Sequence, residues 1–224
     1  MSPQLPAWLR RGLSDSRLAP YLRASAGDAE RAERLYYWNV EAAAAFYGPL
    51  HFLEICLRNV LHDTLTTHFT RADWWHATNL GDHNERKVRE AATRVRENVR
   101  QRPGRVPGPD DVVTELSFGF WVSLLSRRYD RTLWVPVVHR AFADSREPRR
   151  ALHDGLLSLV LLRNRIMHHE PIHHRDLAAD YAKICRMLGY LEPQAAYRLP
   201  HLDRVAEALG RKSGVCGGLM APRF

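Results

Sequence analysis

The residues of this sequence best suited to chemistry are Arg163, Asn164 and His168, which lie within six positions of one another. Histidine has an unperturbed pKa of about 6.5, close to neutrality, so it is suited to proton transfer. Arginine carries a permanent planar charge that binds phosphate or carboxylate through paired hydrogen bonds. On a helix, the Asn164 oxygen can accept from one ring nitrogen of His168 and leave the other free. The three residues therefore indicate proton transfer beside a bound anion.

The element that must position them is an apolar helix predicted over 147–170 and ended by Pro171. Residues 156–162 are apolar nearly all round, so we expect this segment to be buried. A buried guanidinium or imidazole costs several kcal/mol unless it is paired, so the polar residues need a reason to be there. Arg163 and His168 are about 140° apart around an ideal helix, so Arg163 must reach round, or another element or subunit completes the site. A network that only ties helices together remains the structural alternative.

The rest of the chain predicts an all-α fold, because helix signals recur and strand signals are nearly absent. Gly48-Pro49 is expected to separate the first two helices, and the Pro- and Gly-rich segment 103–109 is the best candidate for a domain boundary. The tail from Gly210 is expected to be frayed. The other helices are expected over 29–47, 50–69, 83–102, 110–126, 132–142, 175–191 and 200–209.

Composition limits the class of protein. The 224 residues are 45% apolar, as in globular proteins, and carry a formal net charge of +8 that favours a polyanionic partner or reflects a general preference for Arg. Three widely spaced cysteines predict neither a disulfide framework nor a zinc knuckle, and Cys56 and Cys185 are expected in the core. Residues 1–11 lack the apolar run of a signal peptide, and no run approaches about 18 apolar residues. We expect a cytoplasmic protein without a membrane partner.

Three ordered segments resemble the HEPN superfamily. The stretch 163–168, Arg-Asn-Arg-Ile-Met-His, matches its Arg-x4-His motif, and the extension His169-Glu170-Pro171-Ile172 is similar to the Abi-like (abortive infection) branch. Residues 53–59, Leu-Glu-Ile-Cys-Leu-Arg-Asn, resemble an early family segment. Residues 116–121, Leu-Ser-Phe-Gly-Phe-Trp, resemble a middle one. The resemblance covers about residues 35–188.

The resemblance implies a HEPN-type helical bundle, here with additional flanking helices, that commonly dimerises. For many members it also implies metal-independent endoribonuclease activity. In such cleavage the ribose 2′-hydroxyl attacks the phosphate and leaves a 2′,3′-cyclic phosphate. We expect His168 to act as acid or base, Arg163 to hold the phosphate in the transition state, and Asn164 to orient His168. A two-fold axis would supply two copies of each residue and solve the angular problem.

Other residues are expected to support this site. Glu54 lies on the apolar face of its helix, so it either points into the bundle toward Arg163 or His168, or pairs with Arg58 four positions on. The resemblance alone marks Arg58 and Asn59 as supporting residues. It also hints that His169 assists His168, with Glu170 beside it.

Two further clusters carry alternatives. The expected helix 83–102 presents either a solvated face laced with ion pairs or an RNA track. Its candidate RNA-binding residues are Arg86, Lys87, Arg94 and Arg100. The histidines around Pro171, which include His173 and His174, lack the spacing of a helix-borne zinc site, so no metal or other cofactor is expected.

The sequence thus predicts an N-terminal extension over 1–27, an Abi-like HEPN domain over 28–192, and a short helix with a flexible tail over 193–224. The expected function is cleavage of single-stranded RNA in phage defence or as a toxin, by a homodimer with an antitoxin or regulatory partner. The alternative is a non-catalytic HEPN module that binds RNA or a partner protein.

Overall fold

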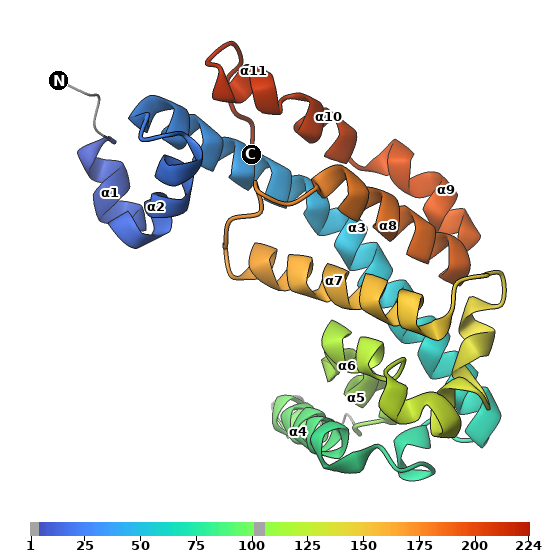
Figure 1. Ribbon diagram of the computed structural model, residues 1–224. Coiled ribbons are helices and arrows are strands. Elements are labelled where there is room, and N and C mark those ends of the chain that lie inside the picture. Colours follow the sequence, from blue (N-terminus) through green and yellow to red (C-terminus); the bar gives the residue numbers. More distant parts are fainter. Residues whose placement is uncertain (1–4, 101–105) are drawn as a thin grey trace. The chain divides into compact units, whose positions relative to one another are not determined.

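The computed structural model describes residues 5–100 and 106–224, and these residues form helices and no strand (Figure 1). The predicted all-α class is confirmed. The α-helices are α1 (Ala7–Leu13), α2 (Asp15–Ala24), α3 (Ala29–Phe69), α4 (Gly81–Arg100), α5 (Pro109–Glu115), α6 (Phe118–Ser123), α7 (Arg149–Met167), α8 (Leu177–Leu191), α9 (Pro193–Leu202), α10 (Val205–Gly210) and α11 (Lys212–Cys216).

The chain divides into two compact units, each assembled from segments distant in sequence. Unit 1 contains Met1–His51, Leu161–Ile184 and Arg198–Phe224. Unit 2 contains Phe52–Val160 and Cys185–Tyr197. The Pro- and Gly-rich segment 103–109 does not separate the units, because its described residues, 106–109, fall inside unit 2. The predicted motif at Arg163 to His168 belongs to unit 1.

Helix α3 runs without interruption from Ala29 to Phe69, so the predicted break at Gly48-Pro49 is wrong. Pro49 removes one main-chain hydrogen bond and costs about 3 kcal/mol in a helix interior. The leucines Leu50 and Leu53 that follow are almost fully buried, and burial of each contributes about 2 kcal/mol. The packing of these two leucines therefore outweighs the local signal.

Helix α3 also has an 18-residue window of mean hydropathy 1.2, 44% of which is buried. Within the described ranges it is the one helix that is long and apolar enough to cross a membrane. The core helix of a protein outside any membrane passes the same test, so this property is weak evidence.

Unit 1 is built on the N-terminal half of α3. Leu35, Trp38 and Phe46 are buried on one stripe of that helix, and the Trp38 indole donates to the main-chain oxygen of Ala208 at 2.8 Å. Residues 5–27 contain the helices α1 and α2, and Tyr21 of α2 is buried.

Unit 2 has shorter helices than the sequence predicted. The expected helix 110–126 is divided into α5 and α6 at Ser117, whose hydroxyl accepts from the amide of Phe120 at 3.3 Å and caps α6. Phe118 and Trp121 behind the cap are buried. In place of the helix expected over 132–142 there are single 3-10 and π turns, and Cys56 and Cys185, expected in the core, are only half-buried.

The C-terminal segment is folded, where the sequence predicted a frayed tail. The helix expected after Pro200 instead has that proline inside α9, and α10 and α11 follow. Glu41 of α3, 3% exposed, fixes this segment. One of its carboxylate oxygens accepts from Arg211 Nε at 2.7 Å, and the other accepts from the amide of Arg223 at 2.9 Å. Arg211 also donates to the main-chain oxygen of Ala221 at 2.5 Å.

Substitution Arg211→Ala should lower the free energy of unfolding by about 3–5 kcal/mol, because it leaves the Glu41 carboxylate buried without its cation. The matched control is Arg223→Ala, which removes an exposed ion pair with Glu207 and should cost at most about 1 kcal/mol. Urea unfolding followed by circular dichroism measures both. Equal losses in the two variants would contradict a structural role for the buried pair.

Candidate functional site

The predicted motif lies where α7 ends, and this end has a defined turn. The helix stops at Met167, three residues before the predicted end, because His169 has a left-handed backbone with φ 56°. The amide of Glu170 donates to the carbonyl of Arg165 at 2.7 Å, and the amide of His169 donates to that of Ile166 at 3.0 Å. These two bonds form a Schellman turn, in which His169 takes the position usually held by glycine. His168 is therefore the residue that caps the helix.

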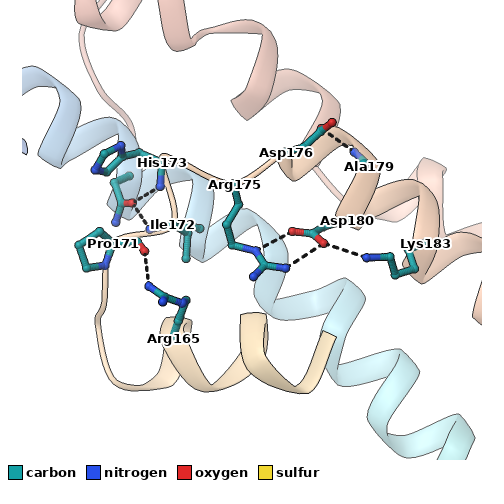
Figure 2. A network of polar contacts seen from close by, with 10 residues as sticks. Arg165, Pro171, Ile172, His173, Arg175, Asp176, Ala179, Asp180 and Lys183 are labelled. Carbon is teal, nitrogen blue, oxygen red and sulfur yellow. Dashed lines mark hydrogen bonds and ion pairs between the residues drawn. The ribbon is translucent and has the colours of Figure 1, made fainter. Parts of the chain in front are cut away.

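The side chain of Arg165 bonds to other residues of the same turn. Arg165 lies 3.6 Å from the carboxylate of Glu170. It also donates to the carbonyl of Pro171 at 3.3 Å (Figure 2). In a Schellman turn the same two positions commonly hold an apolar contact, and here an ion pair replaces it.

Three residues from other helices hold the segment that follows. Arg17 of α2 donates to the carbonyl of His169 at 2.5 Å. The side-chain oxygen of Asn39, on α3, accepts from the amides of Ile172 at 2.8 Å and His173 at 3.0 Å. Lys212 donates to the carbonyl of His173 at 3.0 Å. The backbone after His168 is thus bonded to three separate parts of unit 1.

The start of α8 is fixed in the same way. Asp180, 4% exposed, accepts two hydrogen bonds from Arg175 at 2.8 and 3.0 Å and one from Lys183 at 3.3 Å (Figure 2). Asp176 caps the helix by accepting from the amide of Ala179 at 2.9 Å. The segment between α7 and α8 is therefore held by side-chain hydrogen bonds at both of its ends.

Within this frame His168 is exposed, and Arg163 and Asn164 are half-buried. The main-chain oxygen of Asn164 accepts from the amide of His168 at 2.9 Å, which is the last bond of the helix. The predicted bond from the Asn164 amide oxygen to the His168 ring is not formed. Over the residues that the structure describes, neither of these two side chains has a hydrogen-bond or ion-pair partner.

The prediction that 156–162 is buried on all sides is also wrong. Leu156 and Leu162 are fully buried, but Leu157 is 41% exposed and Leu161 is 54% exposed. Leu161 is one turn before Asn164 and two turns before His168, so these residues share one face of α7. An exposed apolar side chain therefore accompanies the exposed polar ones.

The predicted supporting residues Glu54, Arg58 and Asn59 lie on the part of α3 that belongs to unit 2. Glu54 is half-buried. Arg58 donates from Nε to the side-chain oxygen of Asn59 at 3.0 Å.

Two of the candidate RNA-binding residues of α4 form ion pairs, as expected for a solvated face laced with ion pairs. Arg86 lies 3.6 Å from Glu90, and Arg94 lies 3.0 Å from Glu115. Burial, together with the charge of Arg86, lowers the pKa of Lys87. Arg100 is exposed, and residues 101–102 of the predicted helix lie outside the described part of the chain.

Two histidines of the turn have lowered pKa values. Burial, followed by the charges of His174 and Lys212, lowers the pKa of His173 to about 4. Its Nε2 atom is buried and has no hydrogen-bond partner among the described residues, so a proton there would be a buried donor without an acceptor. Burial lowers the pKa of His174 as well, with Arg165 and Arg175 adding to the effect. No three His, Cys, Asp or Glu side chains in the described ranges lie close enough together to hold a metal ion.

Sequence reasoning missed the residues that hold the turn, namely Arg17, Asn39 and Lys212. Asn39 had a usable signal, because it is a polar residue four positions after the buried Leu35, on the apolar stripe of α3. The other two are exposed or half-buried cations without a distinctive spacing.

We compared the chain with known proteins, and no family model, no curated protein and no solved structure matches it.

Stability should depend on pH through His173. With a pKa near 6.5 unfolded and about 4 folded, the unfolded chain binds more protons between these values. The free energy of unfolding therefore falls as pH falls, by about 2 kcal/mol from this group between pH 8 and pH 5. His173→Phe keeps a ring beside Tyr21, 5.1 Å away, but cannot titrate.

Urea unfolding at pH 8 and pH 5 measures this difference. It should be about 2 kcal/mol smaller in His173→Phe than in the unmodified protein, whereas the exposed control His76→Phe should leave it unchanged. An unchanged pH dependence in His173→Phe would show that this ring is not the titrating group.

Proposed function

We propose that the protein is a metal-independent endoribonuclease of the Abi-like HEPN type that cleaves single-stranded RNA. The observation that carries this proposal is the exposed His168, whose ring has no partner within the described residues although the turn around it is bonded throughout. A network that only ties helices together would use the polar groups of Asn164 and His168 to satisfy each other, and that bond is not formed.

The proposed roles follow from residue chemistry. His168 exchanges a proton with the ribose 2′-hydroxyl or the leaving oxygen, because an imidazole does so near neutral pH. Arg163 binds the phosphate oxygens as negative charge develops, since its guanidinium is always charged. The side-chain amide of Asn164 has no partner among the described residues, and it orients His168 or the ribose once RNA is bound. The bond from phosphorus to the 5′-oxygen breaks as the 2′-oxygen bond forms, which leaves a 2′,3′-cyclic phosphate.

Charges beside the turn support an anionic ligand. Arg165 and Arg175 lie close enough to His174 to lower its pKa, so cations surround the segment that follows His168. Arg165 and Arg175 also form ion pairs with acidic residues. They therefore contribute to the local electrostatic potential but are not unpaired cations.

Cleavage should depend on both motif residues. His168→Ala should lower the rate on single-stranded RNA by about 10²–10⁴-fold, as loss of an acid or base does. Arg163→Ala should lower it by about 10²–10³-fold, because transition-state charge loses a fixed cation. The controls are His76→Ala and Arg140→Ala, which change exposed residues of unit 2.

The assay follows labelled RNA on denaturing gels and identifies 2′,3′-cyclic ends by their resistance to phosphatase. It is repeated with a chelator, which should not change the rate. Undiminished cleavage by both motif variants would refute the proposal. RNA binding without cleavage by the unmodified protein would favour the non-catalytic module instead.

We further propose a homodimer that joins two copies of α7. A separation of about 140° between Arg163 and His168 makes a site completed by a second copy more favourable than one built by a single helix. Leu161 supports this arrangement, because it is 54% exposed on the same face as Asn164 and His168. A two-fold axis at this face would bury both leucines and bring both motifs together.

Leu161→Asp should convert the dimer to a monomer and lower cleavage together with it, because two carboxylates would meet at the axis. Sedimentation velocity and the cleavage assay, at the same protein concentrations, measure the two effects. The control Leu202→Asp changes an exposed leucine of α9 and should alter neither. A Leu161→Asp variant that remains dimeric and active would place the interface, or the site, elsewhere.

The cellular setting is proposed from the resemblance alone. It comprises a cytoplasmic location, a role in phage defence or as a toxin, and control by an antitoxin or regulatory partner.

A further inference from the structure

Unit 1 contains a pocket of about 530 Å³ that the proposed cleavage reaction does not use. It lies between the region where α2 meets α3, which contributes Ala24, Arg31 and Leu35, and the segment of α10 and α11. Its volume is in the range of pockets that bind small molecules. Figure 1 shows α10 and α11 running beside the N-terminal half of α3.

The polar lining of this pocket is cationic. Arg31 and Lys212 carry the two charges, Ser213 adds a hydroxyl, and no carboxylate is among the lining residues in the described part of the chain. The Arg31 side chain has no hydrogen-bond or ion-pair partner within the described residues, although its neighbour Arg34 pairs with Glu30. The exposed Arg31 thus lines a pocket to which the described residues contribute no carboxylate.

Lys212 is held in place by other contacts. Its ammonium lies 4.5 Å from the centre of the Trp38 ring and donates to the carbonyl of His173 at 3.0 Å. An ammonium has three donors, so it can bind a ligand without losing these contacts. The remaining lining includes Leu35 and Leu209, which provide apolar surface beside the cations.

We propose that this pocket binds a small phosphate monoester whose organic part is apolar or aromatic, a mononucleotide included. Two cations match a dianion, and a phosphate monoester carries a charge of about −1.5 to −2 at neutral pH, whereas a simple carboxylate carries one. Arg31 offers the planar pair of donors that fits two phosphate oxygens. The hydroxyl of Ser213 is a third donor, and the leucines contact the organic part.

The site is linked by bonds to the turn that carries His168. Lys212 contacts the pocket and the carbonyl of His173, while His173 lines the pocket and is bonded through its amide to Asn39. The proposal does not depend on RNA cleavage, and its test does not use that activity.

The test measures binding by isothermal titration calorimetry with phenyl phosphate as the probe and phenol as its uncharged counterpart. Phenyl phosphate should bind, inorganic phosphate should compete with it, and phenol should bind at least tenfold more weakly because it lacks the charge. Arg31→Gln should weaken phenyl phosphate binding at least tenfold, as loss of a charged bidentate contact does. The matched control is Arg23→Gln, an exposed arginine of α2 outside the pocket, which should leave binding unchanged.

A second readout locates the bound probe. Cys216 lines the pocket, and phenyl phosphate should slow its alkylation by N-ethylmaleimide at pH 8, measured on the Cys216 peptide by mass spectrometry. Alkylation of Cys56, in unit 2, should not change. The proposal is overturned if phenyl phosphate and phenol bind equally, if neither binds, or if Arg31→Gln and Arg23→Gln behave alike.

Discussion

The buried side chain of Asn39 is the contact on which the site depends. The chain that leaves α7 turns toward α8 through a segment without helical hydrogen bonds, and its amides make a buried bond at Ile172 and a partly buried one at His173. Each buried amide without a partner costs about 1–3 kcal/mol. Asn39, 4% exposed on α3, accepts from both, so one side chain satisfies two donors and joins the turn to the longest helix. The position of His168 is a consequence of that bond together with those from Arg17 and Lys212.

The sequence predicts the helix that carries the motif, and the face that its polar residues share, because both are local properties. Helical periodicity places Asn164 and His168 on one face, and Pro171 requires the helix to end before it. The actual end at Met167 depends on a left-handed His169, and histidine tolerates that conformation too weakly for it to be predicted. The residues that hold the turn, Arg17, Asn39 and Lys212, lie 152, 133 and 39 positions from the residues that they bond, so no spacing rule could find them.

The wrong predictions for Pro49 and the C-terminal tail also arise from contacts between residues that are distant in sequence. Pro49 is a strong local signal, but the buried leucines after it decide in favour of one helix. The Gly-rich tail has weak helical propensity, yet the buried Glu41 binds Arg211 and the amide of Arg223. In both cases a tertiary contact worth a few kcal/mol exceeds a local preference of about 1–3 kcal/mol. Composition likewise marked residues 156–162 as apolar but could not show that Leu161 is exposed.

The polar side chains of the turn differ in whether they have hydrogen-bond partners, and this difference bears on the role of the motif at Arg163 to His168. Arg165 is bonded to Glu170 and Pro171, and Arg175 to Asp180, so the polar residues that flank the motif stabilise the fold. Asn164 and His168 do not contribute in this way over the described residues, and His168 lies directly before the left-handed His169. Left-handed backbone at His169 costs about 1 kcal/mol or more, which an ordinary helix end with glycine would avoid. A slightly strained turn that presents an imidazole without a partner among the described residues is better suited to binding a ligand than to joining two helices.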